Sequence, residues 1–205
     1  MHNSIIAPRS LNRSHAFHKA LPLGVLVYDN SFEADNLLAI AADDLKTSGY
    51  RVGGVVQSNA HRQGRRKCDM YLKDLLSGEE ILISSDRGNE ARGCRLDLAA
   101  FASAGVWGER ALAERVDLLV INKFGKEELH GRGLRPLLAE ALIANIPVII
   151  GVSRLNLDDF LAFTADAGTL LTPVGDAVVI WCRETIMRRA NKRPDEQAET
   201  TNEKT

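Results

Sequence analysis

The chain has 205 residues, a length that suits one domain with a substantial apolar core. Its 26 Lys and Arg residues nearly balance its 27 Asp and Glu residues, which gives a formal net charge of −1. A chain this close to neutral has no overall field that would gather nucleic acid or an anionic membrane, and it has no apolar run long enough to span a bilayer.

The two ends of the sequence and its cysteines indicate a cytoplasmic protein. Residues 1–20 mix basic and polar residues without the apolar stretch of a secretory signal, and they predict a flexible leader. Residues 191–205 contain no aromatic or branched aliphatic residue and predict a disordered tail. The three cysteines are far apart and form no C-x-x-C pattern, which is typical of reduced thiols. The folded domain is therefore expected over residues 21–190.

Within that domain, apolar runs of strand length alternate with segments of helical spacing, which predicts an α/β fold with a mostly parallel sheet flanked by helices. One small antiparallel hairpin is expected around Gly78. The predicted strands are Leu23 to Tyr28, Arg51 to Gln57, Cys68 to Asp74, Glu79 to Ser84, Val116 to Asn122 and Pro147 to Val152. The predicted helices are Glu33 to Ser48, Asp97 to Arg115, Gly133 to Ala144, Leu157 to Ala165 and Asp176 to Arg189.

Ligands of such folds bind beyond the carboxyl ends of the strands, where the strand order reverses. That rule points to three segments: Tyr28 to Asp35, Gln57 to Lys67, and Asn122 to Glu128.

Three stretches of sequence carry a family resemblance. They are LKTSGYRVGG from Leu45, CDMYLKDLLSGEE from Cys68 and VDLLVINKFGKEEL from Val116. In this order and spacing they resemble the cancer-related nucleoside-triphosphatase family of P-loop proteins, which implies a three-layer P-loop-NTPase-like domain. The VYD, ARGCRLD and NKFGK stretches resemble more closely an uncharacterised bacterial side branch of that group. That second resemblance implies an association with molybdenum genes. It does not imply a particular activity.

The segment equivalent to the phosphate-binding loop departs from the family pattern. The pattern is G-x-x-x-x-G-K-[ST], in which backbone N–H groups hold phosphate, the Lys reaches the β- and γ-oxygens and the hydroxyl holds Mg²⁺. Residues 29–36 contain no glycine, and Ala34 falls about where the Lys should be. Three carboxylates already complement the dipole of the first helix and would repel a triphosphate. These carboxylates are Asp29, Glu33 and Asp35.

The end of the predicted strand Val116 to Asn122 also departs from the family pattern, which has two acidic residues there. Asn122 replaces the metal-linked Asp, and Lys123 replaces the acidic residue expected to handle the attacking water. In-line phosphoryl transfer then lacks most of its stabilising groups. Conventional hydrolysis is therefore improbable. ATP or GTP with Mg²⁺ is a possible but disfavoured cofactor, the identity of any cofactor stays open, and the sequence has no metal-site spacing.

Lys123 has two interpretations of near-equal weight. It either faces an anionic ligand in the crevice or pairs with a carboxylate of the first helix, and a pair of this kind would close the site and count against a ligand there. Arg and Gly in the segment 84–95 suggest an anion-binding nest, with a mobile surface loop as the alternative. The ligand-binding candidates are Asp29, Asp35, Asn122, Lys123, Lys126, Arg92 and Arg95.

Three functions follow from these residues. The first is a non-hydrolytic ligand-binding or regulatory protein for a small polar or anionic ligand, linked by the resemblance to molybdenum or oxyanion metabolism. The second is a divergent nucleoside triphosphatase or phosphotransferase, in which Arg92, Arg95 or Lys126 replaces the missing Lys. The third is a protein-interaction module, in which the hairpin and the basic run His61 to Lys67 form the surface. That run lacks the interleaved aromatic residues of a nucleic-acid site, so neither nucleic acid nor membrane is an expected partner.

Overall fold

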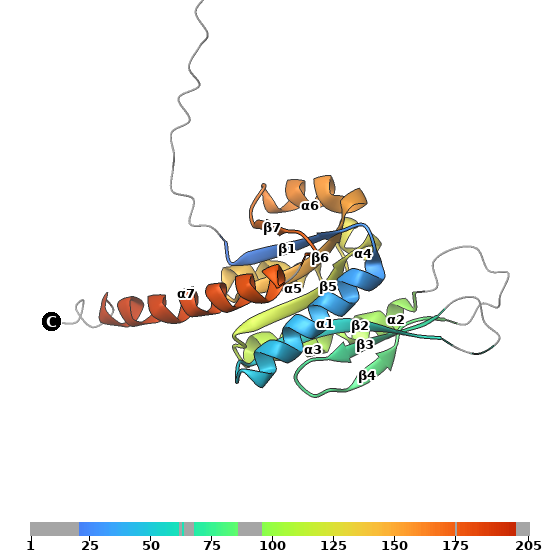
Figure 1. Cartoon of the computed structure of the whole chain (residues 1–205), viewed down its shortest axis with the longest axis horizontal. Helices are drawn as coiled ribbons and strands as arrows, with labels where there is room; N and C mark the ends of the chain where they lie inside the picture. The colour runs from blue at the N-terminus through green and yellow to red at the C-terminus, as the bar shows by residue number, and fades with distance from the viewer. Residues whose placement is uncertain (1–20, 62, 64–67, 86–95, 175, 200–205) are drawn as a thin grey trace, which may run out of the picture.

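The structure is a computed structural model that describes residues 21–61, 63, 68–85, 96–174 and 176–199 (Figure 1). Strands and helices alternate along most of the chain, as the sequence predicts. The strands are β1 (Leu23–Tyr28), β2 (Val52–Ala60), β3 (Asp69–Asp74), β4 (Glu80–Leu82), β5 (Leu118–Phe124), β6 (Val148–Ser153) and β7 (Thr169–Leu171). The helices are α1 (Ser31–Thr47), α2 (Leu98–Ser103), α3 (Gly105–Ala113), α4 (Lys126–Leu129), α5 (Arg135–Ile143), the 3-10 turn η1 (Arg154–Asn156), α6 (Leu157–Thr164) and α7 (Ala177–Glu199).

The seven strands form one sheet in the order β4-β3-β2-β5-β6-β1-β7. The strands β2, β5, β6, β1 and β7 pair in parallel, whereas β3 and β4 pair antiparallel as the predicted hairpin. From β1 the chain runs through α1 to β2, which lies two strand positions beyond β1's neighbour in the sheet. Strands β5 and β6 follow later in the chain and lie between β2 and β1. This reversal of direction brings the start of α1 over the carboxyl ends of the central strands, which is where a ligand site was expected.

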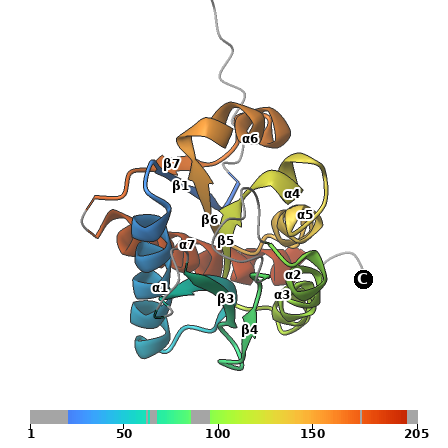
Figure 2. The ribbon, with the colours of Figure 1, turned by 90° about the vertical axis from the view of Figure 1, so that its right-hand side faces the viewer.

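Helices cover both faces of the sheet (Figure 2). On one face, α1 and α7 pack on a core that includes Leu26, Leu38 and Trp181. On the other face, α3, α5 and α6 pack on a second core that includes Leu119, Leu138 and Phe160. The central strands are buried on both faces, because all six residues of β1 and all but Lys123 of β5 are buried. The three-layer α/β architecture predicted from the sequence is confirmed.

Several boundaries differ from the sequence predictions. The predicted helix from Asp97 to Arg115 is two helices, α2 and α3, because a tighter turn bonds the N–H of Trp107 to the carbonyl of Ala104 beside the weak helix former Gly105. The edge strand β7 and the short helix α4 were not predicted, since each is too short for a periodic pattern. Helix α7 continues to Glu199, into the segment predicted as a tail. Among the described helices, none has both the length and the apolar composition that a membrane crossing requires.

Candidate functional site

Helix α1 begins without a phosphate-binding loop. The side chain of Asn30 caps the helix by accepting a hydrogen bond from the N–H of Phe32. The turn between β1 and α1 has no glycine, and Asp35 lies one turn into the helix with its side chain 3% exposed. The helix start is therefore occupied by the chain's own polar groups.

Asp35 is the centre of a buried hydrogen-bond network that joins all three of the segments predicted to lie at the strand ends. Its carboxylate accepts hydrogen bonds from Asn122 Nδ2 at 2.9 Å and from Asn59 Nδ2 at 3.2 Å. The Lys123 ammonium lies 3.0 Å from the carboxylate and also donates to Ser31 Oγ at 2.7 Å. Of the two interpretations of Lys123, the structure therefore shows the internal ion pair.

The Asp35–Lys123 ion pair is largely withdrawn from water. The side chain of Lys123 is 20% exposed and that of Asp35 is 3% exposed. Screening by solvent is weak at this depth, so the two charges hold each other in place more firmly than a surface pair would. The negative charge of Asp35 also acts on Tyr28, at the end of β1. Burial and, second, the charge of Asp35 raise the pKa of the Tyr28 phenol to about 12.

The residues of this crevice differ from those that hold Mg²⁺ in P-loop NTPases. In P-loop NTPases, Mg²⁺ is held by the loop hydroxyl and by the Asp at the neighbouring strand end. If Ala34 stands at the position of the loop Lys, then Asp35 stands at the position of that hydroxyl, and Asn122 stands at the position of the strand-end Asp. These two side chains bond directly to each other, and the Lys123 ammonium supplies the positive charge. In the described residues, Asn122 Oδ1 is the one polar side-chain atom of this cluster left buried without a partner.

The remaining candidates lie outside this network. Asp29 is 74% exposed and pairs at 3.1 Å with Arg154, which follows β6, so the predicted cluster of three carboxylates is not a single group. Lys126 is exposed at the start of α4. Arg92 and Arg95 lie outside the described residues. So do Arg62 and residues 64–67 of the basic run, whereas His61 lies against the thiol of Cys68 at 3.3 Å.

Three of the residues at the site were not identified from the sequence. Asn59 was missed because β2 runs three residues beyond the predicted end at Gln57. Ser31 and Arg154 were missed because each has a role only through a partner distant in the sequence. A polar residue directly after a buried strand is the signal that could have indicated Arg154, since η1 begins where β6 ends.

The GKEEL sequence after β5 has a structural explanation. The buried carboxylate of Glu128 accepts hydrogen bonds from the N–H groups of Gly125 and Leu134, both at 2.9 Å. These bonds fix the loop between β5 and α5. Burial, the largest effect, raises the pKa of Glu128 above its usual value. Glu127 pairs instead with the exposed Arg132, at 2.9 Å. Glu128 is thus held by the backbone.

Comparison with solved structures shows the same fold. The crystal structure of THEP1 from Aquifex aeolicus matches with a TM-score of 0.53 and 14% identity, covering 73% of this chain and 87% of that one. The solution structure of a human cancer-related nucleoside triphosphatase matches with a TM-score of 0.51 and 17% identity, covering 83% and 97%. The chain thus shares its fold with these two solved structures.

Sequence comparison gives two relatives and a family. The chain is 37% identical over 196 residues to the molybdenum import ATP-binding protein ModC 2 of Bradyrhizobium diazoefficiens, covering 91% of this chain but 22% of that protein. It is 29% identical over 98 residues to the nucleoside-triphosphatase THEP1 of Korarchaeum cryptofilum, covering 46% of this chain and 50% of that protein. The chain thus spans half or less of either relative. The model of a family described as "Protein of unknown function (DUF2478)" matches residues 23–181, and the chain therefore belongs to the DUF2478 family.

Proposed function

We propose that this chain is a non-hydrolytic regulatory domain on a P-loop-NTPase-like scaffold, and that it serves molybdenum import. The observation that carries the first part is the buried ion pair between Asp35, at the start of α1, and Lys123, at the end of β5. This pair occupies the place where the scaffold would otherwise receive phosphate and Mg²⁺.

Binding of a nucleotide in this crevice would require several unfavourable steps. A triphosphate would approach the buried carboxylate of Asp35 and the exposed carboxylates of Asp29 and Glu33. A Mg²⁺ ion would have to displace the Lys123 ammonium from Ser31 and Asp35. No glycine-rich loop offers backbone N–H groups in compensation. These features support a domain that does not hydrolyse nucleotides.

The name of one relative supports the role in molybdenum import. The chain matches a region that makes up 22% of a protein named as a molybdenum import ATP-binding protein. A region of this size within a larger protein of that name fits an accessory domain.

A small oxyanion is the ligand class that the rim of the crevice fits. Its interior is closed, but Lys126 and Arg154 follow the carboxyl ends of the neighbouring strands β5 and β6. Lys126 is exposed, and its ammonium makes no hydrogen bond or ion pair in the described part of the chain. Arg154 is 63% exposed, and its pair with the equally open Asp29 is of the weak kind that a competing anion displaces. Molybdate is an oxyanion of this class, and its negative charge complements these two cations.

Two assays on the purified chain test this function. We expect phosphate release from Mg²⁺–ATP and Mg²⁺–GTP to equal that of a buffer blank. In calorimetry we expect saturable heat with molybdate, reduced by Lys126→Ala and by Arg154→Ala. The matched control is Lys73→Ala, which removes an exposed cation from β3 and should leave binding unchanged.

Each part of the proposal can be contradicted by a separate experimental result. Phosphate release that falls with Lys126→Ala would instead establish the divergent triphosphatase. Absence of molybdate heat would remove the oxyanion ligand. In cells grown at limiting molybdate, deletion of the gene should change the cellular molybdenum content, and an unchanged content would contradict the role in import.

A further inference from the structure

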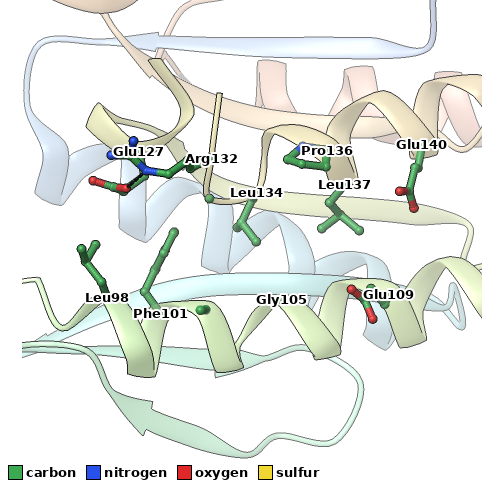
Figure 3. A pocket seen from close by; sticks show the side chains of 12 residues that line it. Leu98, Phe101, Gly105, Glu109, Glu127, Arg132, Leu134, Pro136, Leu137 and Glu140 are labelled. Carbon is green, nitrogen blue, oxygen red and sulfur yellow. Dashed lines mark hydrogen bonds and ion pairs between the residues drawn. The ribbon is translucent and has the colours of Figure 1, made fainter. Parts of the chain in front are cut away.

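A groove of about 380 Å³ lies on the face of the sheet opposite α1, and the function proposed above does not use it. Figure 3 shows its two walls, α2 and α3 on one side and the segment from α4 to α5 on the other. Leu134, Pro136 and Leu137 line the middle of one wall. Leu98 and Phe101 of α2 line the other wall, at the end of the groove where Glu127 and Arg132 lie.

One edge of this apolar lining remains open to water in the folded chain. Leu98 is the first residue of α2, and it is 55% exposed. The side chain of the preceding residue, Asp97, caps this helix. A large apolar side chain held in water at the edge of a groove gains stability when a partner covers it. The opposite wall is firm, because Leu134 and Leu137 are buried in the core of this face.

Two acidic side chains flank one end of the groove. Glu109 of α3 and Glu140 of α5 lie on opposite walls at this end, and both are exposed (Figure 3). Within the described residues, neither carboxylate has a hydrogen-bond or ion-pair partner. At the other end, Glu127 is already paired with Arg132. The lining thus has three carboxylates and one guanidinium, and the two unpaired carboxylates face each other across the groove.

We propose that this groove binds an amphipathic helix of a partner protein, with apolar side chains seated between Leu98, Phe101 and Leu137 and a Lys or Arg placed between Glu109 and Glu140. A helix fits because the walls are themselves helices, and a helix laid in such a groove presents apolar residues at intervals of three and four. The cation follows from charge complementarity, since both walls present an unpaired carboxylate at this end of the groove. This inference does not depend on the proposed role in molybdenum import.

A defined peptide probe tests the groove. The probe is a labelled synthetic helix of about 14 residues, or four turns, with Leu on one face and Lys beside that face. Its controls are a scrambled peptide of the same composition, which lacks an apolar face, and a peptide with Glu in place of each Lys. Binding is measured by fluorescence anisotropy to the whole chain.

Two protein variants separate the apolar contact from the charge. Leu98→Ser removes an exposed apolar side chain, and Glu140→Lys reverses one of the unpaired charges. Each is expected to weaken binding about fivefold or more, as the loss of a favourable contact at an exposed site does. Asp43→Lys makes the same type of charge reversal on α1, on the opposite face, and should leave binding unchanged. Circular dichroism shows whether each variant is folded.

The outcomes decide the proposal in either direction. It is supported if the Leu and Lys peptide binds, both control peptides bind more weakly, and the two groove variants lose affinity while Asp43→Lys does not. It is overturned if the probe fails to bind, if the scrambled peptide binds equally well, or if folded Leu98→Ser and Glu140→Lys proteins bind as the wild type does.

Discussion

Removing Lys123 should destabilise the fold more than removing its partner's charge. In Lys123→Ala, Asp35 keeps its carboxylate at 3% exposure, with the amide groups of Asn122 and Asn59 as its remaining donors. In Asp35→Asn, the amine of Lys123 is left unpaired, but its side chain is already 20% exposed and can turn to water. The charge that has lost its partner is thus the buried carboxylate of Asp35 in the first variant and the solvated ammonium of Lys123 in the second.

These differences set the expected magnitudes. Removing one partner of a fully buried ion pair costs about 3–5 kcal/mol of unfolding free energy. The two amide donors and the partial exposure of Lys123 reduce this to about 2–3 kcal/mol for Lys123→Ala. For Asp35→Asn we expect about 1–2 kcal/mol, because the amide removes the charge that strengthens the bonds from Lys123, Asn122 and Asn59 but keeps one oxygen as an acceptor. As a control, Arg154→Ala removes a pair exposed at both ends and should cost under about 1 kcal/mol.

Urea denaturation followed by circular dichroism measures all three variants. The expected order of destabilisation is Lys123→Ala, then Asp35→Asn, then Arg154→Ala. If Lys123→Ala is no less stable than Arg154→Ala, then the Asp35–Lys123 pair does not hold the crevice closed, and the reasoning above is refuted.

Three further predictions concern the surrounding framework. Gly54→Ala should be far more damaging than Gly78→Ala: both have positive φ, which costs about 1–2 kcal/mol in strain, but a Cβ at Gly54 would lie 2.1 Å from a backbone carbonyl of β5, whereas nothing lies near Gly78. Comparison of the two unfolding midpoints checks this, and equal midpoints would contradict it. Glu128→Ala should lower the free energy of unfolding by about 2–4 kcal/mol, because it leaves two backbone N–H groups without their acceptor, and thermal unfolding that matches the wild type would exclude this role. Spectrophotometric titration should show Tyr28 ionising near pH 12, and Asp35→Asn should lower its pKa only in part because burial is the larger cause. The raised pKa means that the contribution of Tyr28 to stability is lost as pH rises from about 10 to about 12, and ionisation of every tyrosine at its ordinary pKa would contradict the burial.

The fold was largely predictable because its strands are long and apolar. Runs such as LLVI in β5 are buried on both faces, so their composition alone indicates a central parallel strand. The hairpin was predictable from Gly78, whose positive φ marks the turn. The edge strand β7 was not, because Leu170 is 52% exposed and three half-exposed residues carry no period.

The site was predictable in its position but only partly in its contacts. The rule about strand ends placed Asp35, Asn122 and Lys123 in one crevice, and the structure brings them together. It could not say which acid of α1 would pair with Lys123. That choice depends on the rotation of the helix, which turns Asp35 inward while Glu33 faces water. Contacts such as that between Ser31 and Lys123 join residues far apart in the sequence, which leave no local pattern to detect.

The most direct test of the closed crevice is a titration of the isotope-labelled chain with Mg²⁺–ATP, followed by the backbone amide resonances of residues 29–35. The internal ion pair predicts that these resonances do not shift in a saturable way, because no phosphate docks at the start of α1. Saturable shifts at these amides would show that the crevice accepts a nucleotide and would contradict the account.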